Sequence, residues 1–244
     1  MRHVRFYQSA DEVAGADIAE SIAVVADVLR ATSTIVTALA NGCEKVLPVE
    51  KVEEARKAAE QFPREKIILG GERKGKKIDG FDFGNSPQDY TPQAVENKIV
   101  ITTTTNGTKA LVYSGKAEQS LVLSFLNLSA IADYMLRQTN DVALIAAGIY
   151  GDFSVEDSVC CGLLLQKLVE SAPGNFTLDE KTTQVLKLAQ QYIGRIDVLL
   201  QTSPHGDFLR KINYESDLAV CARLDSHQIV PVYEDGFVEI IERY

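Results

Sequence analysis

Short apolar runs alternate with helix-like segments along most of the chain. The run 22–26 has the composition of a buried strand, and helical periodicity follows it from 31 to 40. The alternation continues with predicted strands at 45–49, 67–69, 99–101, 121–123 and 142–147, and with predicted helices at 52–61, 106–113, 130–137 and 155–170. Strands that alternate with helices lie side by side in a parallel sheet. We therefore predict an α/β fold, a layered and mostly parallel sheet with helices on both faces.

Beyond residue 170 the pattern changes. Helical periodicity extends from 179 to 200, and strand-like runs occupy 218–220, 229–233 and 237–241. We expect this C-terminal part to complete or flank the sheet. No repeat, low-complexity tract or Gly/Ser-rich linker marks a boundary. Residues 1–244 are therefore predicted to form a single α/β unit, and a division into two lobes, 1–115 and 116–244, is the alternative.

The charge balance narrows the class of partner. Asp and Glu number 34 against 25 Lys and Arg, a net charge of −9, which is the wrong sign for a surface that collects nucleic-acid phosphates. The first residues form no apolar leader, and no stretch approaches the ~18 apolar residues of a membrane helix. The four cysteines show no C-x-x-C spacing, as expected for reduced thiols. We therefore expect a cytoplasmic protein without nucleic-acid or membrane partners, and a homo-oligomer stays open.

Ligands of open α/β sheets bind beyond the carboxyl ends of the strands, and Asp27 stands at the first such end. It opens the segment DVLRATST, in which Arg30 is followed by hydroxyl side chains that include Thr32 and Ser33. We predict that Asp27 is a metal ligand or a nucleophile and that Arg30 clamps a phosphate. The hydroxyls and the free backbone N–H groups would form an anion seat. The alternative is an ordinary capped helix start.

The segment 70–77 (GGERKGKK) matches the first seven positions of the P-loop pattern G-x-x-x-x-G-K-[ST]. Lys77 stands where the magnesium-binding hydroxyl belongs, and no helix-like sequence follows, so we reject a P-loop. The other interpretation makes Glu72 a metal ligand and turns Arg73 and neighbouring lysines, Lys74 among them, toward an anionic substrate. A solvated run of charges is the alternative.

The segment 80–87 (GFDFGNSP) carries three further polar candidates. Its glycines and its Asn-Ser-Pro ending predict a turn before a helix. Asp82 would be a metal ligand, and Asn85 and Ser86 would contact the substrate. The alternative is that these side chains only brace the loop.

The segment 102–108 (TTTTNGT) leads from a predicted strand into a predicted helix. Hydroxyls together with backbone N–H groups at the positive end of a helix make a phosphate cradle without any lysine. We assign phosphate binding to Thr104, Asn106, Gly107 and Thr108. The alternative is that β-branched residues occur here because they favour strands.

A fifth group of polar residues follows the strand predicted to end at Ala147. Asp152, Glu156 and Asp157 lie there, and one of these carboxylates would complete a hard-cation site, because magnesium prefers oxygen ligands. Of the three histidines, only His205 stands in a context that suggests function, and a structural role is favoured for it.

Five motifs in order resemble the 2-phosphosulfolactate phosphatase family, namely the segments 27–34, 71–73, 80–87, 103–108 and 154–157. Each is weak alone, whereas all five in sequence, from residue 27 to residue 157, are specific. The resemblance implies a magnesium-dependent phosphohydrolase that converts (2R)-2-phospho-3-sulfolactate to 3-sulfolactate and phosphate, a step toward coenzyme M. It thus implies Mg²⁺ as cofactor and a small anionic phosphoester as partner.

The residues and the resemblance together predict one site. Its catalytic residues are Asp27, Arg30 and Arg73, and its metal ligands are Asp27, Glu72, Asp82 and Asp157. Whether Asp27 attacks phosphorus or only holds the metal for an attacking water is left open. One alternative function is a phosphohydrolase for another small phospho-acid. The other is a non-catalytic anion-binding module, which leaves the strand-end carboxylates unexplained because they would repel an anion.

Overall fold

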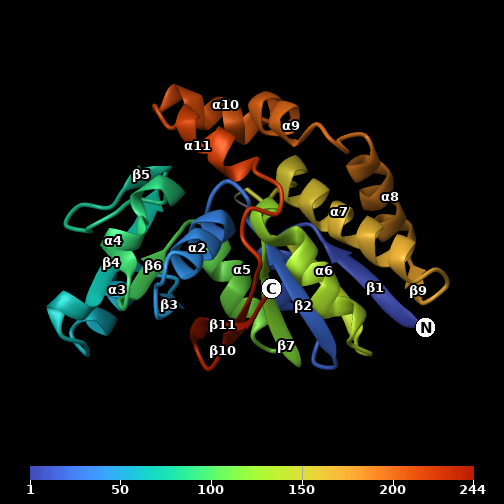
Figure 1. Ribbon diagram of the computed structural model, residues 1–244, viewed down its shortest axis with the longest axis horizontal. Coiled ribbons are helices and arrows are strands. Elements are labelled where there is room, and N and C mark those ends of the chain that lie inside the picture. Colours follow the sequence, from blue (N-terminus) through green and yellow to red (C-terminus); the bar gives the residue numbers. More distant parts are fainter. Residues whose placement is uncertain (150) are drawn as a thin grey trace.

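The computed structural model describes residues 1–149 and 151–244. Within these residues, eleven strands form one sheet in the order β5-β4-β6-β3-β11-β10-β7-β2-β8-β1-β9 (Figure 1). The strands are β1 (Arg2–Tyr7), β2 (Ser21–Ala26), β3 (Lys45–Pro48), β4 (Ile67–Arg73), β5 (Lys76–Lys77), β6 (Ile99–Thr103), β7 (Gln119–Leu123), β8 (Asp141–Ala146), β9 (Phe176–Leu178), β10 (Ile229–Glu234) and β11 (Phe237–Arg243). β2 and β8 are buried from their second residue onward, and for this reason their sequences are continuous apolar runs.

Two groups of parallel strands make up most of the sheet. β4, β6 and β3 form one group, and β7, β2, β8, β1 and β9 form the other. The antiparallel hairpin of β10 and β11 joins them, with β10 beside β7 and β11 beside β3. These pairings confirm the predicted α/β fold with a mostly parallel sheet. They also show that the C-terminal segment completes the sheet, at its centre. Strands from both sides of residue 116 share the second group, since β2 lies between β7 and β8.

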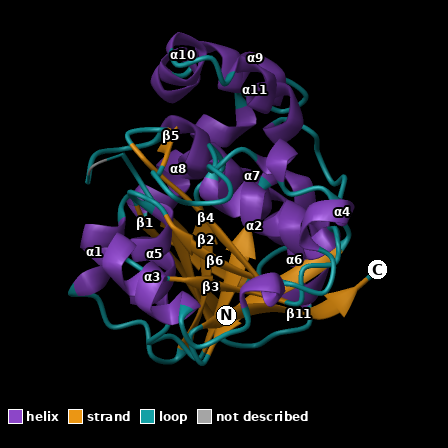
Figure 2. Ribbon diagram, turned by 90° about the vertical axis from the view of Figure 1, so that its left-hand side faces the viewer, coloured by secondary structure: helices purple, strands orange, loops and turns teal. Residues whose placement is uncertain are grey.

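Helices connect the strands and pack on the sheet (Figure 2). They are α1 (Ala10–Ala14), α2 (Ala31–Ala40), α3 (Val52–Ala59), α4 (Pro92–Val95), α5 (Gly107–Ser114), α6 (Leu128–Leu136), α7 (Val155–Ser171), α8 (Glu180–Gln190), α9 (Ile196–Thr202), α10 (Pro204–Lys211) and α11 (Glu215–Cys221), with the short 3-10 helices η1 (Arg64–Lys66), η2 (Pro87–Asp89) and η3 (Phe125–Asn127). None of the helices in the described residues has both the length and the apolar character needed to cross a membrane.

Both faces of the sheet are covered, as β2 illustrates. Val24 belongs to a buried apolar cluster with Ile131 of α6 and Leu164 of α7. Its neighbour Val25 belongs to a second cluster with Ile35 of α2. Successive residues of a strand point to opposite faces, so the two clusters lie on opposite sides of the sheet. The expected helices on both faces are therefore present.

The run 218–220, predicted as strand-like, is part of the helix α11 instead. Asp217, Leu218 and Cys221 are buried, whereas Glu215 and Ser216 are exposed. This spacing is that of one helix face. Three apolar residues in a row are too few to distinguish a strand from a helical turn, and the buried Asp217 hides the helical pattern.

The arrangement brings strand ends from both parallel groups to one place. Three antiparallel pairings lie between the groups, which therefore run in opposite senses along the sheet. Each strand of a sheet is rotated relative to its neighbour, and this rotation accumulates across a sheet of this width. Strands that lie far apart in the sheet therefore need not point in parallel or opposite directions. Residues at the carboxyl ends of β2, β4, β6 and β8 line a common cavity. α9, α10 and α11 lie together at one end of the molecule (Figures 1 and 2), and α10 completes the lining.

Candidate functional site

A cavity of about 250 Å³ lies where the strand ends meet α10. The loops after β2, β6 and β8, the end of β4 and the first turns of α10 all contribute side chains. The polar part of the lining consists of Asp27, Arg30, Glu72, Asn85, Thr104, Thr105, Asn106 and His205. Pockets of this kind, with a few convergent polar groups, are the usual form of small-molecule sites.

Asp27 directly follows β2 and caps the start of α2. Its Oδ1 accepts a hydrogen bond from the backbone N–H of Ala31 at 3.2 Å, and its own N–H donates to Thr32 Oγ1 at 3.0 Å. A Cβ atom at Gly107 would come within 2.6 Å of Asp27 Oδ2. Glycine at this position therefore lets the first turn of α5 approach the carboxylate closely.

Three carboxyl groups are buried around this point. Glu156 and Asp157, in the first turn of α7, are 1% and 4% exposed. Asp157 Oδ1 accepts the N–H of Val28 at 2.8 Å, whereas neither oxygen of Glu156 has a hydrogen-bond partner among the described residues. Burial, together with the negative charges of Glu72 and Glu156, raises the pKa of Asp27 to about 7. Burial also raises the pKa of Glu156 and that of Asp157.

Buried carboxylates of this kind are unfavourable unless protons or a cation neutralise them. Their oxygens are the ligands that Mg²⁺ prefers, and Glu156 has two acceptor oxygens that no donor satisfies. Within residues 1–149 and 151–244, no group of three or more His, Cys, Asp or Glu side chains is already arranged to hold a metal ion. These carboxylate oxygens therefore suit a hard cation chemically, but they are not already gathered into a ligand cluster.

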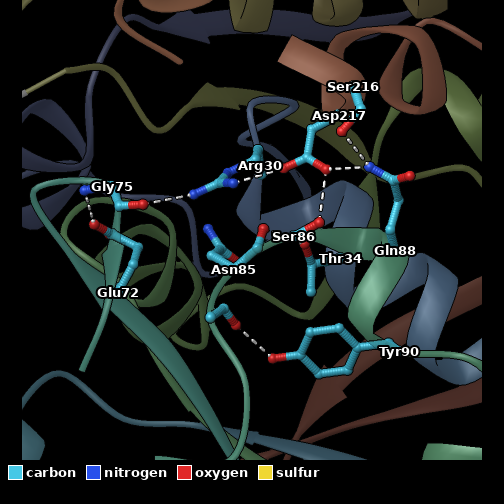
Figure 3. A network of polar contacts seen from close by, with 11 residues as sticks. Arg30, Thr34, Glu72, Gly75, Asn85, Ser86, Gln88, Tyr90, Ser216 and Asp217 are labelled. Atoms are coloured by element: carbon cyan, nitrogen blue, oxygen red, sulfur yellow. Dashed lines mark hydrogen bonds and ion pairs between the residues drawn. The ribbon is translucent and has the colours of Figure 1, made fainter. Parts of the chain in front are cut away.

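Arg30 is anchored between two distant parts of the chain (Figure 3). Its Nη1 lies 2.6 Å from Asp217 Oδ2 in α11, and its Nη2 donates to the carbonyl oxygen of Gly75 at 3.0 Å. Asp217 Oδ1 accepts further hydrogen bonds from Ser86 and Gln88 at 2.6 and 2.8 Å. The two ion-pair side chains are 2% and 0% exposed. Such a buried pair is tolerated because its remaining hydrogen-bonding groups are also satisfied.

Glu72 fixes two turns beside the cavity. Its Oε1 accepts hydrogen bonds from the backbone N–H and the hydroxyl of Thr105 at 2.8 and 2.9 Å. Its Oε2 accepts the N–H of Gly75 at 2.7 Å (Figure 3). Both carboxylate oxygens are thus engaged by the protein itself, and Glu72 links the β4–β5 turn to the loop after β6.

The threonine loop caps α5. The N–H of Thr108 donates to Thr104 Oγ1 at 3.1 Å, and the hydroxyl of Thr108 donates to the carbonyl oxygen of Thr104 at 3.0 Å. These bonds use hydroxyls that the sequence suggested as phosphate ligands. They hold the turn that presents the start of α5 toward Asp27.

The predicted site residues fall into three groups. Those in the cavity lining are Asp27, Arg30, Glu72, Asn85, Thr104 and Asn106. Those buried outside the lining, where their bonds or close packing shape it, are Thr32, Ser33, Ser86, Gly107, Thr108 and Asp157. Arg73, Lys74 and Asp82 form the third group, which the structure does not bring to the lining.

The structure explains why the residues of the third group lie outside the cavity lining. Arg73 adjoins Glu72 in β4, and adjacent strand residues point to opposite faces; its guanidinium donates to the carbonyl oxygen of Glu50 at 3.0 Å and to Thr103 Oγ1 at 2.9 Å. Lys74 is an exposed turn residue with a φ of 54°.

Asp82 instead braces its loop along β4. Its Oδ2 accepts the N–H of Leu69 at 2.8 Å, and its Oδ1 pairs with Arg64. Of the two interpretations open for Asp82, lining the site or bracing the loop, the structure favours bracing.

Phe208 and Asp217 are site or supporting residues that the sequence did not identify, and His205, for which the sequence favoured a structural role, lies in the cavity lining. His205 lines the cavity with its Nδ1 3.7 Å from Glu156 Oε1. Burial, reinforced by the charge of Arg30, lowers the pKa of His205 to about 4, so the ring is neutral at physiological pH. Ser203 accepts the N–H of Gly206 at 3.0 Å, which marks the start of α10. That cap is the only local signal, and nothing in it indicates the distant strand ends.

We expect Asp217→Ala to lower the free energy of unfolding by about 3–5 kcal/mol, because it leaves the buried Arg30 without its counter-ion. Chemical denaturation measures the loss. The matched control is Asp207→Ala, which removes the partner of Arg210 from an ion pair whose side chains are 54% and 30% exposed, and which should cost about 0–1 kcal/mol. Equal losses in the two variants would contradict the anchoring role of Asp217.

The chain matches the family model described as 2-phosphosulpholactate phosphatase over residues 7–236, a span that includes the whole cavity lining. The probable 2-phosphosulfolactate phosphatase of Clostridium acetobutylicum is 39% identical over 232 residues, which cover 93% of this chain and 96% of the relative. Proteins of the same name from Symbiobacterium thermophilum and Caldanaerobacter subterraneus subsp. tengcongensis are 40% and 36% identical, and the matches cover 93% and 95% of this chain and 97% and 95% of those relatives. The resemblance carried by the five motifs is thereby confirmed, and the chain belongs to the 2-phosphosulfolactate phosphatase family.

Proposed function

We propose that this chain is a magnesium-dependent phosphomonoesterase that hydrolyses (2R)-2-phospho-3-sulfolactate to 3-sulfolactate and phosphate. The observation that carries the proposal is the group of buried carboxylates, Asp27, Glu156 and Asp157, beside a cavity that also receives the start of α5. Family membership supports phosphomonoester hydrolysis, and the names of the relatives supply the substrate.

The phosphoryl group would bind at the start of α5. The first N–H groups of a helix have no intrahelical acceptor, so a helix start attracts anions. Thr104 and Asn106 line the cavity at this point. The bonds between Thr104 and Thr108 and those from Thr105 to Glu72 hold the turn in place, which limits the reorganisation needed when charge develops on the phosphoryl oxygens.

Carboxylates next to an anion site repel the substrate unless a cation lies between them. We assign Asp27 and Glu156 as the residues that would hold Mg²⁺, an ion that usually keeps several waters and binds through one or two carboxylates. Neither oxygen of Glu156 has a hydrogen-bond partner among the described residues, whereas both Glu72 oxygens and Asp157 Oδ1 accept backbone N–H groups. This assignment adds Glu156 to the ligands expected from sequence and omits Glu72, Asp82 and Asp157. The ion, when bound, would polarise the phosphoryl group and balance its charge.

Asp27 has the central chemical role in this proposal. Its carboxylate stands at the strand end beside the start of α5, within the same lining as Thr104 and Asn106. It would either attack phosphorus or accept the proton of an attacking water. Arg30, held by Asp217 and Gly75, would keep a fixed positive charge beside the phosphoryl oxygens.

We expect phosphate release from 2-phospho-3-sulfolactate in the presence of Mg²⁺ and none after the protein has been dialysed against EDTA. The reason is that the carboxylates would otherwise repel the substrate. Readdition of Mg²⁺ should restore release, whereas readdition of K⁺ at matched ionic strength should not. Full activity in chelator after dialysis would refute the metal requirement.

A second prediction for the metal uses stability and needs no substrate. The pKa of Asp27 rises from 3.8 to about 7 on folding, so between these values the folded state keeps a proton that the unfolded chain has lost. Its contribution to stability is therefore full below the lower value and is lost as pH rises through the higher one. We expect Mg²⁺ to raise the thermal unfolding midpoint more at about pH 8 than at about pH 5. An equal shift at both pH values would contradict cation binding to these carboxylates.

Asp27→Asn keeps the shape of the side chain and removes its charge, so the fold should persist while turnover falls by about 10²-fold or more. The control is Asp82→Asn, which should act at nearly the wild-type rate because Asp82 lies outside the cavity lining. Partial rescue by high Mg²⁺ would identify Asp27 as a ligand, and a trapped acyl-phosphate in the wild type would identify it as the nucleophile. A folded Asp27→Asn variant with full turnover would remove Asp27 from the mechanism.

A further inference from the structure

A second cavity, of about 270 Å³, lies between α1, α5 and the loop after β8; we call it the side cavity. α1 packs against α5 (Figure 2). The N–H of Ala10 donates to the carbonyl oxygen of Ala147 at 3.3 Å, which ties the start of α1 to the residue that follows β8. Thr105 and Asn106 line the side cavity and also the candidate cavity at the strand ends. The two cavities therefore adjoin at the turn that precedes α5.

Lys109, in the first turn of α5, is the only Lys or Arg among the described residues that line the side cavity. It pairs with Asp11 of α1, and the two side chains are 33% and 59% exposed. The hydrogen bond to Asp11 raises the pKa of Lys109, so this side chain is cationic at physiological pH. An exposed ion pair contributes little to stability. Asp11 can therefore return to water when another anion takes its place beside the flexible lysine side chain.

The proposed substrate carries a sulfonate in addition to its phosphoryl and carboxylate groups. Only three atoms, the ester oxygen, C2 and C3, separate phosphorus from sulfur, so the sulfonate must bind close to the phosphoryl group. Lys109 is two residues beyond the first residue of α5, a rise of about 3 Å along the helix. It therefore lies within reach of a substrate whose phosphoryl group is bound at the start of α5.

The candidate cavity itself supplies one cationic side chain. Among the described residues that line it, Arg30 is the only Lys or Arg. In the proposed function, this guanidinium stays beside the phosphoryl oxygens while Asp217 and Gly75 hold it. Lys109 in the adjoining side cavity is thus the cation available to a second anionic group of the same substrate.

We propose that the sulfonate of the substrate binds in the side cavity beside Lys109, and that Lys109 thereby determines the preference for phosphoesters with this additional anionic group. The ammonium group would exchange Asp11 for the sulfonate and donate a charge-assisted hydrogen bond to it. This inference rests on the proposed phosphatase function and assigns the residue that recognises the acid part of the substrate. Arg73 and Lys74, which the sequence suggested for this role, belong to the described lining of neither cavity.

Two substrates that differ only in whether C3 carries the sulfonate, 2-phospho-3-sulfolactate and 2-phospholactate, test this assignment. We define the sulfo-to-methyl ratio as kcat/KM for the first compound divided by kcat/KM for the second. Lys109→Gln should lower this ratio by about tenfold, the low end of the range for a hydrogen bond to a charged group. The fraction of folded protein cancels in the ratio, so a folding defect cannot produce the change.

The outcomes separate this inference from the proposed function. An unchanged ratio in Lys109→Gln, including an equal loss on both substrates, would overturn the assignment of the sulfonate to Lys109. The phosphatase proposal would then still stand on turnover by the wild type. Absence of turnover of both substrates by the wild type in Mg²⁺ would overturn the phosphatase proposal and this inference together.

The matched control is Lys181→Gln. Lys181 pairs with Glu12, the neighbour of Asp11 in α1, and its side chain is 40% exposed. It lies outside the described lining of both cavities, so its sulfo-to-methyl ratio should equal that of the wild type. A ratio lowered as far as in Lys109→Gln would overturn the assignment, because the loss of any lysine beside α1 would then suffice.

Asp11→Asn tests the same assignment with the opposite sign. This variant removes the carboxylate that competes with the sulfonate for the Lys109 ammonium group. We expect the sulfo-to-methyl ratio to rise by about two- to fivefold, the range that an exposed ion pair supplies. A lowered ratio would overturn the proposal, because removal of a negative charge from the side cavity must favour an anion that binds there.

Discussion

The buried ion pair between Arg30 and Asp217 ties the C-terminal helices to the strand ends. Its partners are 187 positions apart in the chain, and both side chains are almost fully buried. Charges at such depth persist only when they are paired and hydrogen-bonded, and Gly75, Ser86 and Gln88 supply the remaining partners. α10 and α11 follow each other closely, so the pair that fixes α11 also fixes α10. The cavity depends on it, because α10 provides His205 and Phe208.

The electrostatics of Asp27 show which of two opposing effects prevails. The carboxylate stands at the start of α2 and beside the start of α5, and the positive ends of helices favour its charged form by about 0.3–1 kcal/mol each. Burial and the neighbouring carboxylates act in the opposite direction, and they raise its pKa to about 7. Desolvation therefore outweighs the two helix ends. A group balanced in this way changes its protonation readily, as the role proposed for Asp27 requires.

The sequence indicated β2 and β8 because each is a continuous apolar run, whereas it did not indicate β1, whose buried and exposed residues alternate. It placed Asp27, Glu72, Thr104 and Asn106 at strand ends. It could not separate Glu72 from Arg73, since that requires knowing which face of β4 meets the cavity. The alternation of side chains along the strand decides it. For Asp82 the sequence left two roles open, and the structure favours bracing because the loop turns back along β4, where Asp82 accepts the N–H of Leu69. Asp217 lies in a short helix among polar residues, so the sequence does not indicate that it is buried and paired with Arg30. Only tertiary packing brings these two side chains together.

The central hairpin has a consequence for the way the chain is made. β10 and β11 are the last strands in chain order, yet they lie between β7 and β3 in the middle of the sheet. A chain that folds as it is synthesised forms its N-terminal parts first, so both parallel groups can assemble before the hairpin that joins them has left the ribosome. Until then β3 and β7 each present an unpaired edge, the kind of surface through which strands of different molecules associate. Arrival of the hairpin covers both edges at once. The same hairpin joins the two strand groups whose carboxyl ends line the candidate cavity, so the protection of both edges and the joining of these groups are acquired together.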